Sequence, residues 1–223
     1  RDIEQNTWAT FNVLEAMRRS GIRKIAYPST GSIYGEPEIF PTPETNPFPI
    51  QTSLYGASKL ACEGLMEAYC EGFGFQCWIF RLVSILGERY THGHVIDFYK
   101  KLLENDQELQ VLGDGHQKKS YLYVHDCIDA MLVAIRKGHE KVNIFNLGTD
   151  ETIEVNDSVR WIVGRLGLAP KISYTGGARG WAGDSPCIFL DCKKIRALGW
   201  SPKRSIRDGM IRTLDFLEQN QQL

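Results

Sequence analysis

A tyrosine and a lysine four residues apart form the pair in this sequence best suited to chemistry. Tyr55 and Lys59 bound the run Tyr-Gly-Ala-Ser-Lys, and positions i and i+4 of a helix lie on the same face, one turn apart. A phenol is a poor base at neutral pH, but a fixed positive charge within a few ångströms favours the phenolate. We therefore expect Lys59 to lower the pKa of Tyr55, so that the phenol can act as a general base.

A short apolar strand is predicted to end in hydroxyl groups upstream of this pair. Residues 25–30 read Ile-Ala-Tyr-Pro-Ser-Thr, and ligands of parallel sheets gather at the carboxyl ends of strands. This places Thr30 where its hydroxyl, the Tyr55 phenol and the Lys59 ammonium converge on one substrate oxygen. The tyrosine and lysine alone are a weak signal, because chance gives such a pair about once in a chain of this size.

The elements that must position these side chains alternate between helix and strand. The hydrophobic pattern predicts helices near residues 3–20, 54–71, 96–103, 125–135, 155–166, 191–198 and 206–217, and strands near 25–30, 76–86, 109–112, 120–124, 142–147 and 171–174. The segment 36–53 is rich in proline, which predicts a surface loop, either bordering the site or serving as a plain connector. The chain is therefore predicted to be an α/β protein.

Several motifs, in their order and spacing, resemble the extended short-chain dehydrogenase/reductase family, which contains the nucleotide-sugar epimerases and dehydratases. They are Ser29 to Gly35 (Ser-Thr-Gly-Ser-Ile-Tyr-Gly), Tyr55 to Lys59, Arg81 to Gly87 (Arg-Leu-Val-Ser-Ile-Leu-Gly) and Leu198 to Pro202 (Leu-Gly-Trp-Ser-Pro). The resemblance implies a Rossmann-like doubly wound parallel sheet, N-terminally incomplete, with a smaller mixed α/β substrate domain. It places the NAD-binding domain at residues 1–86 plus 125–148 and the substrate domain at 87–124 plus 149–223.

NAD is the cofactor that this resemblance implies. Family members carry three βα units of about 30 residues before the first helix seen here, including the glycine turn that holds the dinucleotide pyrophosphate. We therefore expect roughly ninety further residues before this chain, and weak or no NAD binding by the 223 residues alone. The family's motif positions assign contact with NAD to Asn6, Ser29, Tyr55, Lys59 and Val83.

A nucleotide-diphosphate sugar is the implied substrate, and the resemblance assigns its binding to Thr30, Gly31, Ser32, Ser84, Lys119 and Arg179. Ser84 stands where the family has asparagine, and Lys119 where it has arginine, with Lys118 as a competing candidate. A lysine neutralises a phosphate as a point charge but cannot fork across two oxygens. Arg179 is assigned because an arginine precedes a Gly-Asp pair in the family. Here the pair is Gly183-Asp184, and two more residues than in the family separate it from Arg179.

The implied reaction is the NAD-dependent 4-epimerisation of a UDP-hexose through a transient 4-keto sugar, with Thr30, Tyr55 and Lys59 as catalytic residues and Tyr55 as the base. A 4,6-dehydratase of this family uses acidic residues just after the catalytic threonine, where this sequence has Gly31 and Ser32. Neither can act as an acid or base at neutral pH, which favours an epimerase. A 4,6-dehydratase or keto-sugar reductase is the alternative within the family, and a non-catalytic nucleotide-sugar-binding protein is the alternative from another class.

The amino-acid composition limits which binding partners and which cellular compartment we expect for the protein. With 26 lysine and arginine residues against 27 aspartate and glutamate residues, the net charge of -1 gives no argument for nucleic acid or an anionic membrane. The six cysteines form no CxxC pair, and no apolar run approaches the ~20 residues of a membrane span, so we expect a cytoplasmic protein. No metal is expected, because the pair His92 and His94 has no carboxylate or thiolate cluster nearby. The resemblance further implies a homodimer through the helices near 3–20 and 54–71.

Overall fold

The computed structural model describes residues 1–47, 50–180 and 187–220, which form two compact units. The first unit comprises Arg1–Val83, Asp129–Gly148 and Leu190–Ser201, and the second comprises Ser84–Ile128, Thr149–Phe189 and Pro202–Leu223. We expected residues 84–86 and 125–128 in the first domain, but they group with the second unit. We expected the segment 190–201 in the substrate domain, but it groups with the first unit. The reason is that Leu190 pairs with Thr42 and the helix that follows packs against a strand of the first unit.

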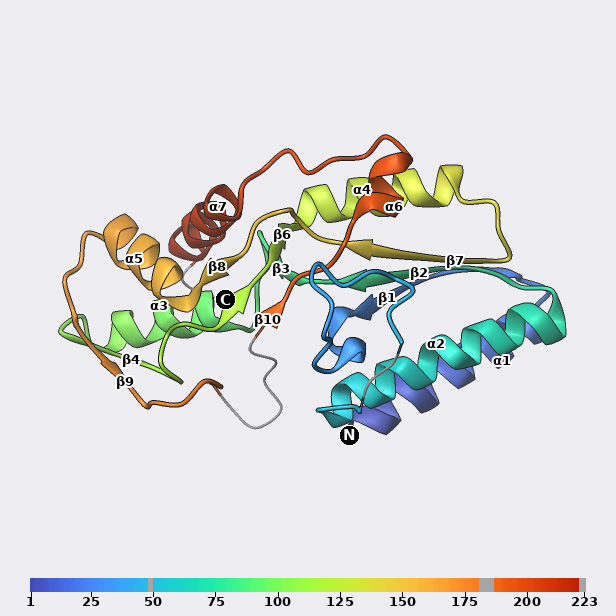
Figure 1. The fold of residues 1–223 in the computed structure, drawn as a ribbon, viewed down its shortest axis with the longest axis horizontal. Coiled ribbons are helices and arrows are strands. Elements are labelled where there is room, and N and C mark those ends of the chain that lie inside the picture. The colour runs from blue at the N-terminus through green and yellow to red at the C-terminus, as the bar shows by residue number, and fades with distance from the viewer. Residues whose placement is uncertain (48–49, 181–186, 221–223) are drawn as a thin grey trace. The chain divides into compact units, whose positions relative to one another are not determined.

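A three-stranded parallel sheet forms the centre of the first unit (Figure 1). β1 (Lys24–Thr30) pairs with β2 (Gln76–Leu82), and β2 pairs with β7 (Val142–Leu147). The middle strand β2 is almost entirely buried, as expected for a parallel strand covered on both faces. The predicted α/β fold with a parallel, Rossmann-like sheet is confirmed.

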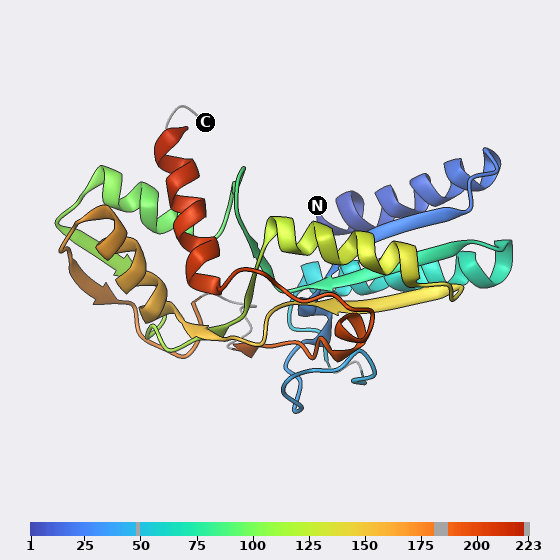
Figure 2. The same ribbon diagram turned by 90° about the horizontal axis from the view of Figure 1, so that it is seen from above.

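Helices cover both faces of this sheet (Figure 1 and, from above, Figure 2). The π-helical turn η1 (Ile3–Trp8), α1 (Ala9–Arg19) and α2 (Leu54–Phe73) lie on one face, and α4 (Val124–Lys137) and α6 (Lys193–Ala197) lie on the other. α2 begins where the Ser53 hydroxyl accepts a hydrogen bond from the Gly56 amide at 3.0 Å, and ends at Gly74 in the left-handed conformation. Between α1, α2 and the sheet lies an apolar core that includes Leu14, Met66, Tyr69 and Ile79.

Buried polar side chains cross the three strands in a row, one residue before each strand ends. Ser29, Arg81 and Asn146 are register partners in this row. Arg81 forms an ion pair with Glu63 of α2, with Nη2 2.8 Å from Oε2 and both side chains 2% exposed, and Glu63 also accepts a hydrogen bond from the Ser29 hydroxyl. On its other side Arg81 donates to the Tyr34 hydroxyl at 2.8 Å, which donates to Asn146 Oδ1 at 2.9 Å. Both buried charges in this polar row are therefore paired, as burial requires.

The second unit packs three helices against short strands. The helices are α3 (His94–Glu104), α5 (Val155–Leu166) and α7 (Ile206–Gln219). The strands are β3 (Ser84–Leu86) paired with β6 (Tyr121–Tyr123), β4 (Glu108–Val111) paired with β9 (Lys171–Tyr174), and the sheet β10 (Cys187–Ile188), β5 (Lys118–Lys119) and β8 (Ile153–Glu154). An apolar core that includes Tyr99, Leu109, Ile162 and Met210 joins them. This unit has the mixed α/β character that we predicted.

Some predicted strands are shorter in the structure than in the sequence analysis. We expected one strand over 76–86, but it divides into β2, which ends at Leu82, and β3, which pairs in another sheet. We expected a strand over 120–124, but β6 ends at Tyr123 because Val124 already opens α4. Among the helices of the described ranges, none is long and apolar enough to cross a bilayer.

Gly56 lies where α2 approaches the short 3-10 helix η2 (Gly31–Tyr34). A Cβ at Gly56 would lie 2.8 Å from the Ser32 carbonyl oxygen and 3.0 Å from Gln51 Oε1. We expect Gly56→Ala to lower the free energy of unfolding by about 1–3 kcal/mol, measured by urea denaturation with circular dichroism. Gly72→Ala, at a helical glycine with open space around it, is the matched control and should be neutral or stabilising by up to about 1 kcal/mol. Equal stability of the two variants would contradict the close approach.

Candidate functional site

Thr30 and Tyr55 meet at the carboxyl end of β1. Thr30 closes the strand and caps η2, where its Oγ1 accepts a hydrogen bond from the Ser32 amide at 3.1 Å. The Thr30 hydroxyl also lies close enough to the Tyr55 phenol, in the first turn of α2, to lower the pKa of that phenol. Since Tyr55 is 43% exposed, a ligand can reach its ring.

The electrostatics of Tyr55 differ from our expectation. Burial raises the pKa of Tyr55 and the hydrogen bond with Thr30 lowers it, with a net shift upward. We predicted that Lys59 would lower this pKa, but the Lys59 ammonium donates to the Pro28 carbonyl oxygen at 2.6 Å and lies 4.2 Å from the centre of the Tyr27 ring. The helical spacing places Lys59 one turn beyond Tyr55, while the strand decides where its ammonium points.

Lys59 holds its ammonium in a buried position. The residue is 9% exposed, and burial lowers its pKa while the neighbouring Cys62 and Glu63 raise it, with a net shift downward. An ammonium has three N–H donors, and the Pro28 carbonyl accepts one of them. The remaining donors suit neighbouring hydroxyl groups of a ligand, such as those of a ribose.

The other three residues assigned to the cofactor hold protein elements together or are buried. Asn6 of η1 donates to the Ser58 hydroxyl of α2 at 2.9 Å. The Ser29 hydroxyl is buried and donates to Glu63, and Val83, just after β2, is 4% exposed. Contact of Asn6, Ser29 and Val83 with NAD stays a prediction.

Gly31 and Ser32 form the turn that follows Thr30. Gly31 is buried, and the Ser32 hydroxyl accepts a hydrogen bond from the Thr30 hydroxyl at 3.2 Å. The turn Gly31–Tyr34 contains no carboxylate. At this end of β1 the protein therefore presents hydroxyl groups and a phenol to a substrate, and the adjacent η2 adds no carboxylic acid.

Ser84, Lys119 and Arg179 belong to the second unit. Ser84 is exposed and opens β3, and Arg179 is exposed in the loop after β9. Lys119 of β5 is partly buried opposite Ile153, whereas Lys118 is exposed, which supports the choice of Lys119. Residues 183 and 184, the Gly-Asp pair used to assign Arg179, lie outside the described residues. Contact of these three side chains with a nucleotide-diphosphate sugar stays a prediction.

His94 is partly buried at the start of α3. Its Nδ1 lies 3.3 Å from the Tyr121 hydroxyl, and its ring packs edge-on against Phe98. Burial lowers the pKa of His94 to about 4, and the nearby positive charge of Lys119 lowers it as well, so the imidazole is neutral at pH 7. Across the described parts of the chain, no group of three histidine, cysteine, aspartate or glutamate side chains is arranged to hold a metal ion.

Sequence reasoning missed Glu63 and Arg81 as a pair. Glu63 follows Tyr55 by eight residues, which places it on the same face of the helix, and this spacing is a signal that could have found it. Arg81 is a charged residue at the end of the apolar run Cys77 to Phe80. A charge in such a strand needs a buried partner of opposite sign, but the sequence does not say which carboxylate supplies it.

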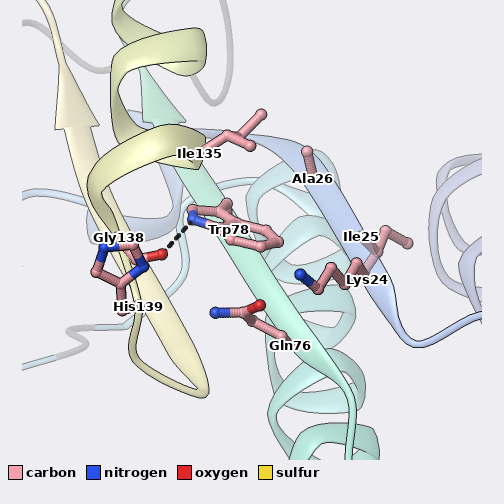
Figure 3. Close-up of a pocket in the computed structure, with 8 residues that line it drawn as sticks. All are labelled: Lys24, Ile25, Ala26, Gln76, Trp78, Ile135, Gly138 and His139. Atoms are coloured by element: carbon pink, nitrogen blue, oxygen red, sulfur yellow. Dashed lines mark hydrogen bonds between the residues drawn. The ribbon is translucent and has the colours of Figure 1, made fainter.

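A pocket of about 420 Å³ lies at the other end of the strands (Figure 3). Its lining includes Lys24 and Gln76, the first residues of β1 and β2, and Trp78, whose indole nitrogen donates to the Gly138 carbonyl oxygen at 3.3 Å. Because ligands of parallel sheets bind at the carboxyl ends, this pocket is not the candidate active site.

Thr30 supplies the hydrogen bond that lowers the pKa of Tyr55. Thr30→Val keeps the branched shape and removes the hydroxyl, so we expect the pKa of Tyr55 to rise further. Tyrosine labelled with carbon-13 at the ring Cζ, assigned with Tyr55→Phe, reports this titration by NMR. Thr213→Val, at a buried hydroxyl of the second unit, is the control. An unchanged or lower Tyr55 pKa in Thr30→Val would show that the hydrogen bond is absent.

Known proteins resemble this chain over nearly all of its length. The model of the "NAD dependent epimerase/dehydratase family" matches residues 1–148. A solved UDP-galactose 4-epimerase is 33% identical with a TM-score of 0.90, and the match covers 98% of this chain and 71% of that one. The UDP-glucose 4-epimerase of Thermotoga maritima, solved with UDP-glucose, is 29% identical with a TM-score of 0.84 over 96% and 69%. The dTDP-D-glucose 4,6-dehydratase of Mus musculus is 27% identical over 96% and 61%.

Proposed function

Because the chain belongs to the NAD-dependent epimerase/dehydratase family, we propose that it is an isomerase that inverts C4 of a UDP-hexose, of the UDP-glucose and UDP-galactose type, through a transient 4-keto sugar. The observation that carries this proposal is the junction of β1 with α2. There Thr30, Tyr55 and Lys59 gather beside the turn Gly31–Tyr34, which has no carboxylate.

The residues beside Tyr55 fit NAD. The buried Lys59 ammonium has donors beyond the one that Pro28 accepts, and these suit the two hydroxyls of the cofactor ribose. Bound at this site, NAD would supply the hydride chemistry by which C4 of the sugar is oxidised and then reduced. The protein's own side chains then have to orient the sugar and move one proton.

Tyr55 is the group that we assign to the proton. Its phenolate takes the proton of the sugar C4 hydroxyl as the keto sugar forms, and the resulting phenol gives the proton back when the alcohol is restored. Burial opposes ionisation of this phenol, while the Thr30 hydroxyl favours it. Thr30 also donates to the same substrate oxygen, which fixes the distance between that oxygen and the phenol.

A 4,6-dehydratase is the alternative function, because the chain is also similar to the mouse dTDP-D-glucose 4,6-dehydratase. That reaction must remove a proton beside the keto group and protonate a leaving hydroxyl, so it needs an acid and a base in addition to Tyr55. Gly31 and Ser32 supply neither. This observation favours epimerisation.

NMR of the full protein with NAD and UDP-glucose tests the proposal. We expect the anomeric signal of UDP-galactose to grow until the two sugars reach equilibrium. A 4-keto-6-deoxy product would replace the epimerase with a dehydratase. Absence of any product from UDP-glucose, UDP-N-acetylglucosamine, GDP-mannose and dTDP-glucose would favour a non-catalytic nucleotide-sugar-binding protein.

Tyr55→Phe should leave the fold intact and lower turnover by ~10² or more, because the general base is lost. The melting temperature and the circular dichroism spectrum check the fold, and the NMR assay measures turnover. Tyr174→Phe, at an exposed tyrosine of β9, is the matched control and should keep wild-type turnover. Turnover of Tyr55→Phe within a few-fold of wild type would remove Tyr55 from the mechanism.

We also propose a homodimer through α1 and α2. Their exposed faces carry small residues, namely Ala9 and Ala16 on α1 and Ala61, Gly64 and Ala68 on α2. Small side chains let helices of two copies approach closely, and a two-fold axis would bring the same pair of helices from each copy together. In the same N-terminal helical segment, Trp8 and Phe11 are 59% and 36% exposed.

A large charge on this face should break the dimer. We expect Ala61→Arg to convert the protein to a monomer, because the guanidinium would be buried without a partner. Light scattering coupled to size-exclusion chromatography measures the mass. Leu103→Arg, at a 60% exposed position of α3, is the control and should leave the mass unchanged. An unchanged mass for Ala61→Arg at micromolar concentration would place any interface elsewhere.

The cytoplasm is the compartment that we propose. All six cysteines are free thiols, and Cys187 alone among them is not buried. Free buried thiols are typical of proteins from reducing compartments.

A further inference from the structure

The helix α2 binds the end of β1 through side chains on one face. The Lys59 ammonium donates to the Pro28 carbonyl oxygen at 2.6 Å, and one turn further Glu63 accepts a hydrogen bond from the Ser29 hydroxyl. These two strand residues directly precede Thr30. The position of the Thr30 hydroxyl is therefore set by two contacts from the helix that also carries the candidate base.

Glu63 is held in place by the polar row of the sheet. Its Oε2 accepts from Arg81 Nη2 at 2.8 Å and from Nε at 3.2 Å, so the guanidinium fixes the plane of the carboxylate. Arg81 is the register partner of Ser29 on β2. The Glu63 carboxylate thus links α2 to β1 and β2 at the register position that precedes Thr30.

Glu63 also acts on the charge of Lys59. Cys62 and, one turn beyond Lys59, the carboxylate of Glu63 both oppose the lowering of the Lys59 pKa by burial. The titratable groups around Lys59 are Tyr27 on β1, Tyr55, Cys62 and Glu63 on its own helix, and Arg81 on β2 behind Glu63. Asp2, before η1, acts on Tyr55.

We propose that Glu63 is a positioning residue for the epimerase reaction: its carboxylate stabilises the ammonium of Lys59 and, through Ser29, sets the position of Thr30. This inference rests on the proposed function for its kinetic consequence. The effect of the Glu63 carboxylate on the Lys59 ammonium does not depend on catalysis and can be measured in protein that turns over no substrate.

Two variants of the full protein separate these effects. Glu63→Gln removes the charge and keeps the shape, so the Lys59 ammonium should lose its proton at lower pH. We expect kcat to fall about tenfold or more with KM within about threefold, and the alkaline limb of the kcat profile to move to lower pH. Ser29→Ala removes only the strand contact, so kcat should fall about 3- to 10-fold without moving that limb.

Ser158→Ala is the matched control for Ser29→Ala. Ser158 is fully buried in α5 of the second unit, and within the described residues its hydroxyl has no hydrogen-bond partner. The substitution should leave kcat within about twofold of wild type. Loss of activity in Ser158→Ala equal to that in Ser29→Ala would overturn the positioning role of Ser29.

NMR titration of lysine labelled with carbon-13 at Cε, assigned with Lys59→Arg, measures the charge effect without turnover. We expect the Lys59 midpoint to lie lower in Glu63→Gln than in wild type. If Arg81, left without its partner, prevents folding, Glu63→Gln/Arg81→Met removes both charges, and the Lys59 midpoint should then fall by less, because the more distant positive charge of Arg81 is lost as well. An unchanged midpoint overturns the inference. If the wild-type protein is inactive and the Lys59 midpoint is still lower in Glu63→Gln than in wild type, the proposed function is overturned and the electrostatic inference stands.

Discussion

The buried ion pair between Glu63 and Arg81 is the constraint on which the first unit depends. Taking either charge out of water costs several kcal/mol unless its partner and further hydrogen bonds are in place. Arg81 also donates to the Glu44 carbonyl oxygen at 3.0 Å, and the Glu44 carboxylate accepts a hydrogen bond from the backbone N–H of Asn146 at 2.8 Å. The pair therefore requires α2, β2, β7 and the described part of the proline-rich loop to assemble together, which makes this part of the loop more than a plain connector.

This arrangement separates the groups that hold the sheet from those that can react. The polar row through Ser29, Arg81 and Asn146 satisfies its own charges, so it makes no demand on the residues one step further along the strands. At that next position Thr30 keeps its hydroxyl for Tyr55 and Ser32. A rigid support beneath Thr30 is what a site needs in order to bind a substrate oxygen in one orientation, and the single proton of the Thr30 hydroxyl would then pass from the Ser32 hydroxyl to that oxygen.

The sequence predicted elements and faces better than it predicted contacts. The helix over 155–166 has the predicted bounds, because its periodicity and the following Gly167 are local signals. The direction of the Lys59 ammonium was missed, since Pro28 is 31 residues away along the chain and the rotamer depends on it. The pairing of Glu63 with Arg81 was missed for the same reason. The return of 190–201 to the first unit likewise depends on a distant bridge, between Thr42 and Leu190.

The length of α2 gives the molecule a mechanical property. Its 20 residues, capped at both ends, span about 30 Å and behave as a stiff rod. Tyr55 is attached at one end of this rod, and near the other end Tyr69 donates to Glu15 of α1 at 2.6 Å. Between these ends Lys59 and Glu63 tie the helix to Pro28, Ser29 and Arg81, so these contacts act as the pivot for any tilt. The remote end of α2 is thus one arm of a lever, and an engineered ligand site placed there would act on the phenol by straining the contacts at the pivot.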